Sequence, residues 1–151
     1  MASFNHRLSG SLQQAVCLAA GGEWASAMLD DAEDHQPGDA WIAQGTGQLK
    51  FHRIYMCCTP IWDDGIWNED RLLVYCYRNV LKLVDTRHVK SLAVPLLATG
   101  KHRYPDERAI RLAVETCIEE APEGLEEIHF TALDPQIHDL VVKRLDKELD
   151  D

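Results

Sequence analysis

The stretch of sequence that decides the fold is Ser91-Leu92-Ala93-Val94-Pro95-Leu96-Leu97-Ala98-Thr99-Gly100-Lys101-His102-Arg103-Tyr104-Pro105. Its first eight residues are almost wholly apolar and predict a buried strand, and Pro105-Asp106-Glu107 predicts the start of a helix. In sheets whose strands alternate with helices, ligands bind beyond the carboxyl ends of the strands. The segment from Thr99 to Tyr104 is therefore the first candidate for a binding site.

Helical and strand patterns alternate on both sides of this stretch. We expect helices after Ser11, over 23–29, from Asn68, from Pro105 and after Asp134, and strands at 40–44, 53–59, 91–98 and 127–133. The strands are apolar without regular alternation, which is typical of strands covered on both faces. The pattern predicts an α/β fold with a mainly parallel sheet between helices.

Length and charge limit the possible functions. The 151 residues predict one domain over 1–151, and 46% apolar residues suffice for a core. The net charge of −10 argues against non-specific DNA binding, which needs a basic surface. No apolar run is long enough to cross a membrane, and the first residues do not resemble a signal peptide.

Cysteine and histidine patterns give no sign of a metal site. The five cysteines are odd in number and form no C-x-x-C pair, so we expect buried free thiols in a reducing cytoplasm. The seven histidines lack ligand spacing, so neither a metal nor another cofactor is expected.

Two loops are candidates for binding an anion. In the first, Gly100 allows close approach of the backbone to a phosphate, Lys101 and Arg103 supply charge, and the following helix N-terminus adds its dipole. The alternative is an exposed loop with incidental basic residues. The second loop runs from Asn5 through Gly10 to Leu12, and there Ser11 is equally well explained as a helix N-cap.

Taken in order, these segments resemble the macro domain family, which binds ADP-ribose, and most of all its bacterial O-acetyl-ADP-ribose deacetylase type. The matching residues are Asn5-x-x-Leu8-x-Gly10, Ala19-Ala20-Gly21, Pro37-Gly38-x-Ala40, Gly47-x-Leu49, Ile54-Tyr55, Asn68-Glu69-Asp70, Tyr77-x-Asn79, Ser91 through Pro95, Thr99-Gly100, Tyr104-Pro105 and Asp134.

The resemblance implies a three-layer α/β/α sandwich with a mixed, mainly parallel sheet and ADP-ribose over the strand ends. It assigns the diphosphate and the distal ribose to the loop of Thr99, Gly100, Lys101, His102, Arg103 and Tyr104. It assigns Gly10, Ser11 and Leu12 to the opposite side of the phosphates, and Asn5 to the distal ribose.

Several departures from the family pattern bear on activity. Gln13 stands at the position of an aspartate that is implicated in activating water or orienting substrate, and an amide cannot serve as a general base. The loop from Thr99 to Tyr104 has lost the second glycine of the family pattern, where Lys101-His102-Arg103 now stand, and Leu133 falls where many relatives carry an aromatic that stacks on adenine. Only four residues precede Asn5, so the first strands of the family's sheet are missing or reduced.

Three functions follow as alternatives. The first is binding of ADP-ribose or a related nucleotide with weak or absent hydrolysis. The second is an active hydrolase of ADP-ribosyl derivatives, such as an O-acetyl-ADP-ribose deacetylase or a mono-ADP-ribosyl hydrolase, that uses a bound water and Asn5. The third is a structural or interaction protein that has lost the ligand. A nucleophilic Cys17 is a weaker fourth hypothesis.

The short N-terminus also predicts an assembly. Without the first strands, either the sheet closes around fewer strands or apolar strand edges over 54–59 and 92–98 stay unpaired. We therefore expect a homo-oligomer or a partner segment that completes the sheet.

Overall fold

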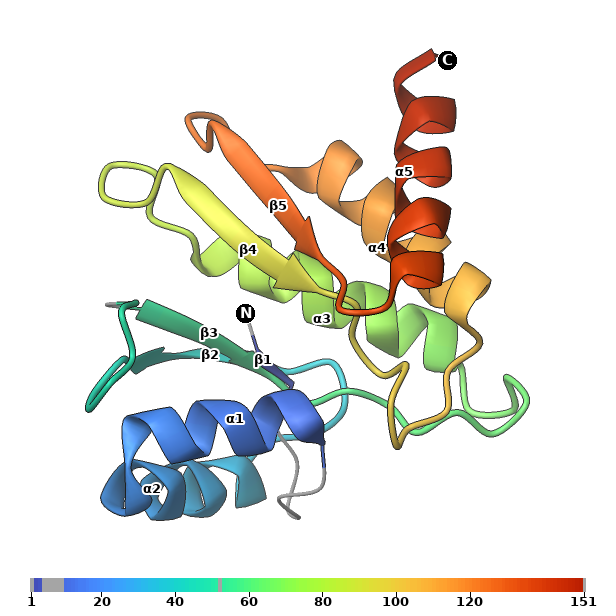
Figure 1. Ribbon diagram of the computed structural model, residues 1–151. Coiled ribbons are helices and arrows are strands. Elements are labelled where there is room, and N and C mark those ends of the chain that lie inside the picture. The colour runs from blue at the N-terminus through green and yellow to red at the C-terminus, as the bar shows by residue number, and fades with distance from the viewer. Residues whose placement is uncertain (1, 4–9, 52, 151) are drawn as a thin grey trace.

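The computed structural model describes residues 2–3, 10–51 and 53–150, which form helices and strands that are interspersed along the chain (Figure 1). Their order is β1 (Ala2–Ser3), α1 (Ser11–Ala20), α2 (Gly22–Glu33), β2 (Ala40–Gln44), β3 (Arg53–Cys57), α3 (Glu69–Leu83), β4 (Ser91–Pro95), α4 (Asp106–Glu120), β5 (Glu127–Thr131) and α5 (Pro135–Asp150). No helix of this described part is long and apolar enough to cross a membrane.

The strands form two separate groups. The first has the order β1-β3-β2, with β1 parallel and β2 antiparallel to β3. The second is the parallel pair β4-β5, in which Ser91 faces Glu127 and Pro95 faces Thr131. The strands are thus mixed and mainly parallel, as expected. Strand β1 comprises Ala2 and Ser3, which lie opposite Met56 and Cys57 of β3.

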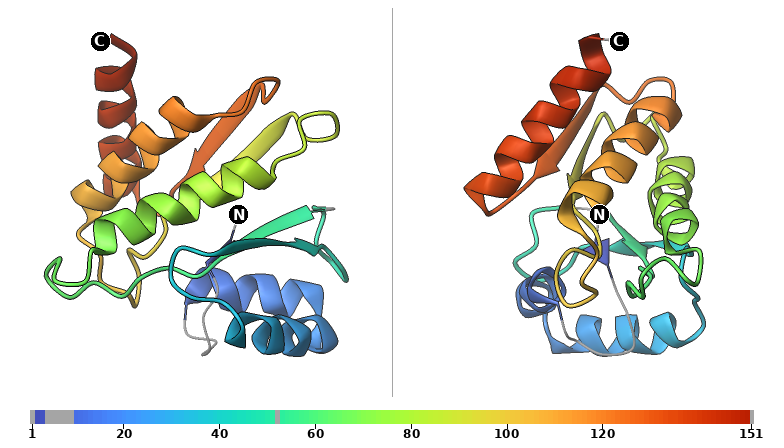
Figure 2. Two further views of the ribbon diagram at one scale, coloured as in Figure 1. Left: turned by 180° about the vertical axis from the view of Figure 1, so that it is seen from behind. Right: turned by 90° about the vertical axis from the view of Figure 1, so that its right-hand side faces the viewer.

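Helices cover the strands from two sides and build the α/β/α layers (Figure 2). Helix α3 holds both groups together, because its residues Tyr77 and Val80 share one buried cluster with Tyr55 of β3 and with Leu92 and Val94 of β4. On the opposite face of β2 and β3, a second buried cluster joins these strands to α1 and α2, and it includes Cys17, Trp24, Trp41, Ile54 and Met56.

The prediction that all strands are covered on both faces is wrong for β4 and β5. Strand β3 is buried from Ile54 to Cys57, but β4 and β5 alternate between more exposed and more buried residues. Leu92 and Val94 face the helices, whereas Ser91 and Ala93 are exposed. One face of this pair therefore lacks a covering helix in the described part of the chain, which the apolar composition of 91–98 did not reveal.

The helix starts differ in detail from the sequence predictions. Gly10, not Ser11, is the N-cap of α1, and no side chain caps this helix. Asn68 precedes α3 with a positive φ of 59° and makes no side-chain cap. Instead, the buried carboxylate of Glu69 accepts hydrogen bonds from the backbone N–H groups of Asp63 and Trp67 at 2.8 and 2.9 Å. A first-turn acid thus fixes the loop before the helix.

Candidate functional site

A cavity of about 450 Å³ lies where β4 and β5 end, beside the N-terminus of α1. Figure 1 shows that the loops following both strands reach this end of the molecule. The lining residues come from four segments, namely 10–13, 95–102, 131–134 with Ile137, and Thr59. This position, beyond the carboxyl ends of parallel strands, is where ligands bind in α/β folds.

The structure brings most of the predicted site residues to this one cavity. Gly10, Ser11, Leu12 and Gln13 line one side, and Thr99, Gly100, Lys101 and His102 line another. Arg103 and Tyr104 do not line it, and Asn5 lies outside the described residues. Thr59, two residues after the end of β3, also lines the cavity. It was not selected in the sequence analysis, although a polar residue just after a strand is a sign of a possible site residue.

The N-terminus of α1 offers backbone donors to the cavity. A helix leaves its first N–H groups without an intrahelical acceptor, and here the amides of Ser11 and Leu12 stand in that position, with no acidic residue in the first turn. The helix dipole adds a partial positive charge. The predicted donor helix was α4, but Asp106 and Glu107 occupy its first turn and do not line the cavity. Of these two helix N-termini, that of α1 lines the cavity and that of α4 does not.

Backbone hydrogen bonds shape the loop after β4. The N–H of Arg103 donates to the carbonyl of Gly100 at 2.9 Å, and the N–H of Tyr104 donates to the carbonyl of Ala98 at 3.0 Å. Ala98 and Arg103 both have positive φ, of 65° and 56°, so the loop is tightly curled at its two ends. Gly100 sits at its tip with open space around the place of a Cβ atom. The loop therefore presents unobstructed backbone to the cavity.

His102 fastens this loop to the segment after β3. Its Nδ1 lies 3.0 Å from the carbonyl oxygen of Pro60 and 2.9 Å from Thr59 Oγ1. A carbonyl only accepts, so Nδ1 carries the proton. Burial lowers the pKa of His102, which favours the neutral ring near pH 7. Lys101, which is exposed, thus supplies the cationic side chain of this wall.

Tyr104 braces the loop from behind. It is buried, its hydroxyl donates to Asp70 Oδ1 at 2.5 Å, and its ring packs against Trp62 at 4.8 Å between centroids. Arg108 binds the same carboxylate, with Nη2 2.6 Å from Oδ2. The hydrogen bonds from Arg108 and Tyr104 lower the pKa of Asp70. In this structure Tyr104 therefore supports the loop and does not line the cavity.

Replacing Asp70 by asparagine is expected to lower the free energy of unfolding by about 1–2 kcal/mol at pH 7, since charged hydrogen bonds are lost at a partly exposed site. The folded pKa lies below the unfolded one, so the carboxylate stabilises the fold at neutral pH and loses that effect as pH falls through the folded value. The difference from wild type should therefore shrink below about pH 4 in urea unfolding curves. Asp146→Asn, on an exposed part of α5, is the control, and equal losses in both variants would contradict this role.

The remaining polar groups of the cavity offer little for catalysis. Gln13 is buried and carries an amide. Asp134 accepts the N–H of Gln136 at 2.8 Å and thereby caps α5, as predicted for it. Cys17 does not line the cavity, and burial raises the pKa of its thiol, which does not suit a nucleophile. Nowhere in 2–3, 10–51 and 53–150 are three or more His, Cys, Asp or Glu side chains grouped to hold a metal ion.

Comparisons with known proteins agree on one family. A family model described as the macro domain matches residues 4–113. A macro domain-containing protein of Cupriavidus necator is 32% identical over 144 residues. The matched region covers 93% of this chain and 77% of the Cupriavidus protein. O-acetyl-ADP-ribose deacetylase 1 of Pantoea vagans is 35% identical over 111 residues, covering 72% of this chain and 64% of its own. The chain thus spans less than two thirds of the length of that enzyme.

Solved structures show the same fold. A mutant of the Oceanobacillus iheyensis macrodomain, solved with ADPR, superposes with a TM-score of 0.85 at 24% identity, over 95% of this chain and 80% of that one. A Trypanosoma brucei macrodomain in complex with ADP-ribose gives a TM-score of 0.76 at 22% identity, over 93% of this chain and 60% of that one.

Proposed function

Because the chain belongs to the macro domain family, we propose that it binds ADP-ribose or a related ADP-ribosyl nucleotide in the 450 Å³ cavity, with weak or absent hydrolysis. Similar proteins were solved with ADP and ADP-ribose, which supports this class of ligand. The observation that carries the proposal is that the α1 N-terminus and the open Gly100 loop line one cavity.

We place the diphosphate between these two elements. The amides of Ser11 and Leu12 donate from one side, the backbone around Gly100 donates from the other, and Lys101 adds a positive charge. This arrangement concentrates donors for an anion on a chain whose net charge is −10.

Titration calorimetry tests the proposal. ADP-ribose should give saturable heat with a single site, whereas AMP, which lacks the second phosphate and the distal ribose, should bind more weakly. Absence of saturable heat with ADP-ribose would refute the proposal and favour a fold that has lost its ligand. Such a result would favour the third function considered above, that of a structural or interaction protein.

Leu133 offers a place for the base. Its side chain is fully exposed and lines the cavity beside Asp134. Leu133→Tyr should tighten ADP-ribose binding about threefold to tenfold, because a ring stacked on the base adds about 0.5–1.5 kcal/mol. The affinity for ribose 5-phosphate, which has no base, should not change. Equal effects on both ligands, or none on ADP-ribose, would place the base elsewhere.

Hydrolysis of ADP-ribosyl derivatives is the second candidate function, because several similar proteins are named O-acetyl-ADP-ribose deacetylase. It would require Asn5 and a bound water, and Gln13 provides no base for it.

A further inference from the structure

A buried carboxylate at the start of α3 is held by backbone donors. The side chain of Glu69 is buried, and its two oxygens accept the backbone N–H groups of Asp63 and Trp67 at 2.8 and 2.9 Å. Burial alone would raise the pKa of Glu69, but hydrogen bonds from its own backbone N–H and from those of Asp63, Trp67 and Gly65 lower it. The charged carboxylate therefore fixes residues 63–67 as one turn at neutral pH.

The segment 60–62, directly before this turn, is bound to the loop after β4. The N–H of Trp62 donates to the carbonyl of His102 at 2.9 Å, and His102 Nδ1 donates to the carbonyl of Pro60 at 3.0 Å. The ring of Trp62 also packs against Tyr104 at the end of the loop. Figures 1 and 2 show the two segments running beside each other. We call the four residues Pro60, Trp62, His102 and Tyr104 the clamp.

Two neighbouring acids of α3 anchor the clamp from its two sides. Glu69 binds the N–H of Asp63, the residue next to Trp62, and Asp70 accepts the hydroxyl of Tyr104 at 2.5 Å. Neither acid lines the nucleotide cavity, so both act on the loop through other residues. The start of α3 thereby determines where the loop after β4 lies relative to the cavity.

We propose that Glu69 is a positioning residue for the diphosphate, because it holds the Gly100 loop through the clamp at the place where this loop and the α1 N-terminus can donate to one ligand. The inference rests on the proposed binding of an ADP-ribosyl nucleotide and adds a determinant of its affinity. A loop that is fixed before the ligand arrives does not have to be ordered on binding, which favours tight binding. Loss of the carboxylate releases residues 63–67 and removes this advantage.

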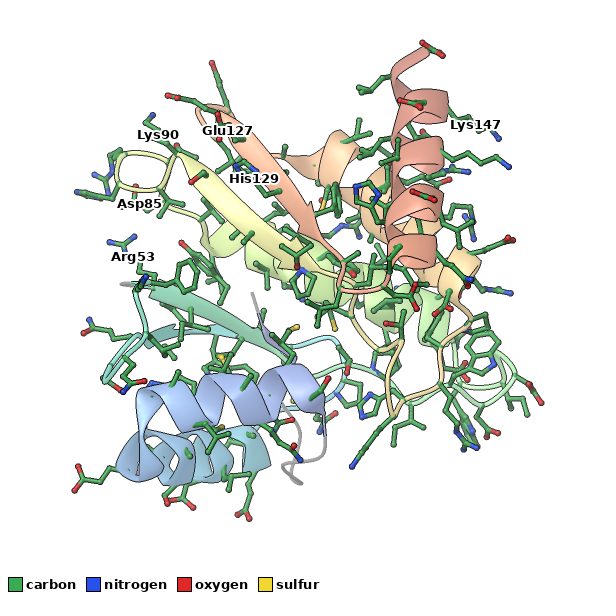
Figure 3. The ribbon with its side chains drawn as sticks, viewed as in Figure 1. Arg53, Asp85, Lys90, Glu127, His129 and Lys147 are labelled. Carbon is green, nitrogen blue, oxygen red and sulfur yellow. The ribbon has the colours of Figure 1, made fainter. Side chains whose placement is uncertain are left out.

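Glu69→Gln tests the proposal, because an amide oxygen can accept one of the two N–H groups while the amide nitrogen faces the other. In titration calorimetry this variant should bind ADP-ribose about tenfold more weakly, as expected for loss of a group within one hydrogen-bond network. Glu127→Gln is the matched control, because Figure 3 shows Glu127 at the start of β5, the end remote from the cavity. It should bind ADP-ribose as wild type does.

A double-mutant cycle separates positioning from a general loss of stability. If Glu69 acts through the clamp, Glu69→Gln should weaken ADP-ribose binding less than about threefold in a His102→Ala background, where the clamp is already broken. Equal losses in the two backgrounds would overturn the proposal. Glu115→Gln loses ion pairs with Arg111 and Arg144 between α4 and α5, so it should lower stability and leave the affinity unchanged.

Hydrogen exchange of the ligand-free protein gives a readout that does not depend on the nucleotide. Glu69→Gln should speed exchange of the Arg103 and Tyr104 amides, which donate within the loop, at least about tenfold more than Glu115→Gln does. Equal exchange in the two variants, or unchanged ADP-ribose affinity in Glu69→Gln, would contradict the role of Glu69. Failure of the wild type to bind ADP-ribose would refute the proposed function, and the exchange rates would still show whether Glu69 holds the loop.

Trp62→Leu tests the same link if Glu69→Gln does not fold. It keeps the Glu69 carboxylate and the backbone bond of residue 62, and it removes the ring that contacts Tyr104 and lies 5.2 Å from the guanidinium carbon of Arg108. ADP-ribose should bind this variant about threefold more weakly than wild type. An affinity equal to that of wild type would show that the clamp does not position the loop.

Discussion

Gly100→Val is expected to weaken ADP-ribose binding at least a hundredfold while the protein remains folded. A Cβ at Gly100 meets no atom within 4 Å, and the residue does not have a positive φ, so the protein accommodates valine. The added side chain occupies the space proposed for the diphosphate. Loss of two charge-assisted hydrogen bonds, at ~1.5–3 kcal/mol each, accounts for this factor.

Calorimetry on Gly100→Val should be paired with Gly22→Val. Gly22 also has open space around its Cβ position and ordinary φ, but it lies at the start of α2 and does not line the cavity. The control should bind ADP-ribose as wild type does. Unchanged affinity in Gly100→Val would contradict the placement of the diphosphate at this loop.

Turnover of O-acetyl-ADP-ribose is expected to be on the order of 10²–10⁴-fold slower than that of the Pantoea vagans deacetylase assayed alongside it, the factor that general acid–base assistance typically contributes. Gln13 offers an amide, Asp134 is committed to capping α5, and His102 directs its protonated Nδ1 toward Thr59 and Pro60. No other carboxylate among the described residues lines the cavity.

Gln13→Asp should recover part of the missing rate, because it places a carboxylate on the cavity wall within the first turn of α1, where the helix dipole favours a negative charge. The rate of product formation is measured by chromatography. Gln14→Asp, at an exposed neighbouring position, is the control. Wild-type turnover equal to that of the relative would instead establish the chain as a hydrolase.

Local patterns predicted the order and type of the elements well. The pair Asp134-Pro135 marked the start of α5, and the apolar run from Arg53 marked β3 as a strand buried on both faces. The expected layers and the mainly parallel pairing also hold. These features depend on short-range periodicity and capping, which a single sequence displays directly.

Features that depend on distant neighbours were not predictable in the same way. The run 91–98 is almost wholly apolar, yet β4 ends at Pro95 and exposes Ser91 and Ala93, because no helix covers that face in the described part of the chain. Likewise, the positions of α1 and α4 relative to the strands decide which helix N-terminus lines the cavity. The basic residues Lys101 and Arg103 could not reveal these positions.

Amide NMR during titration with ADP-ribose tests the central claim most directly. Saturable shifts should be largest for the backbone N–H groups of Ser11, Leu12, Gly100 and Lys101, which face the proposed diphosphate site. Those of Lys143 and Lys147 on α5 should stay in place, because they do not line that cavity. Shifts confined to other segments, or no saturable shifts with ADP-ribose, would contradict the assignment of this cavity as the nucleotide site.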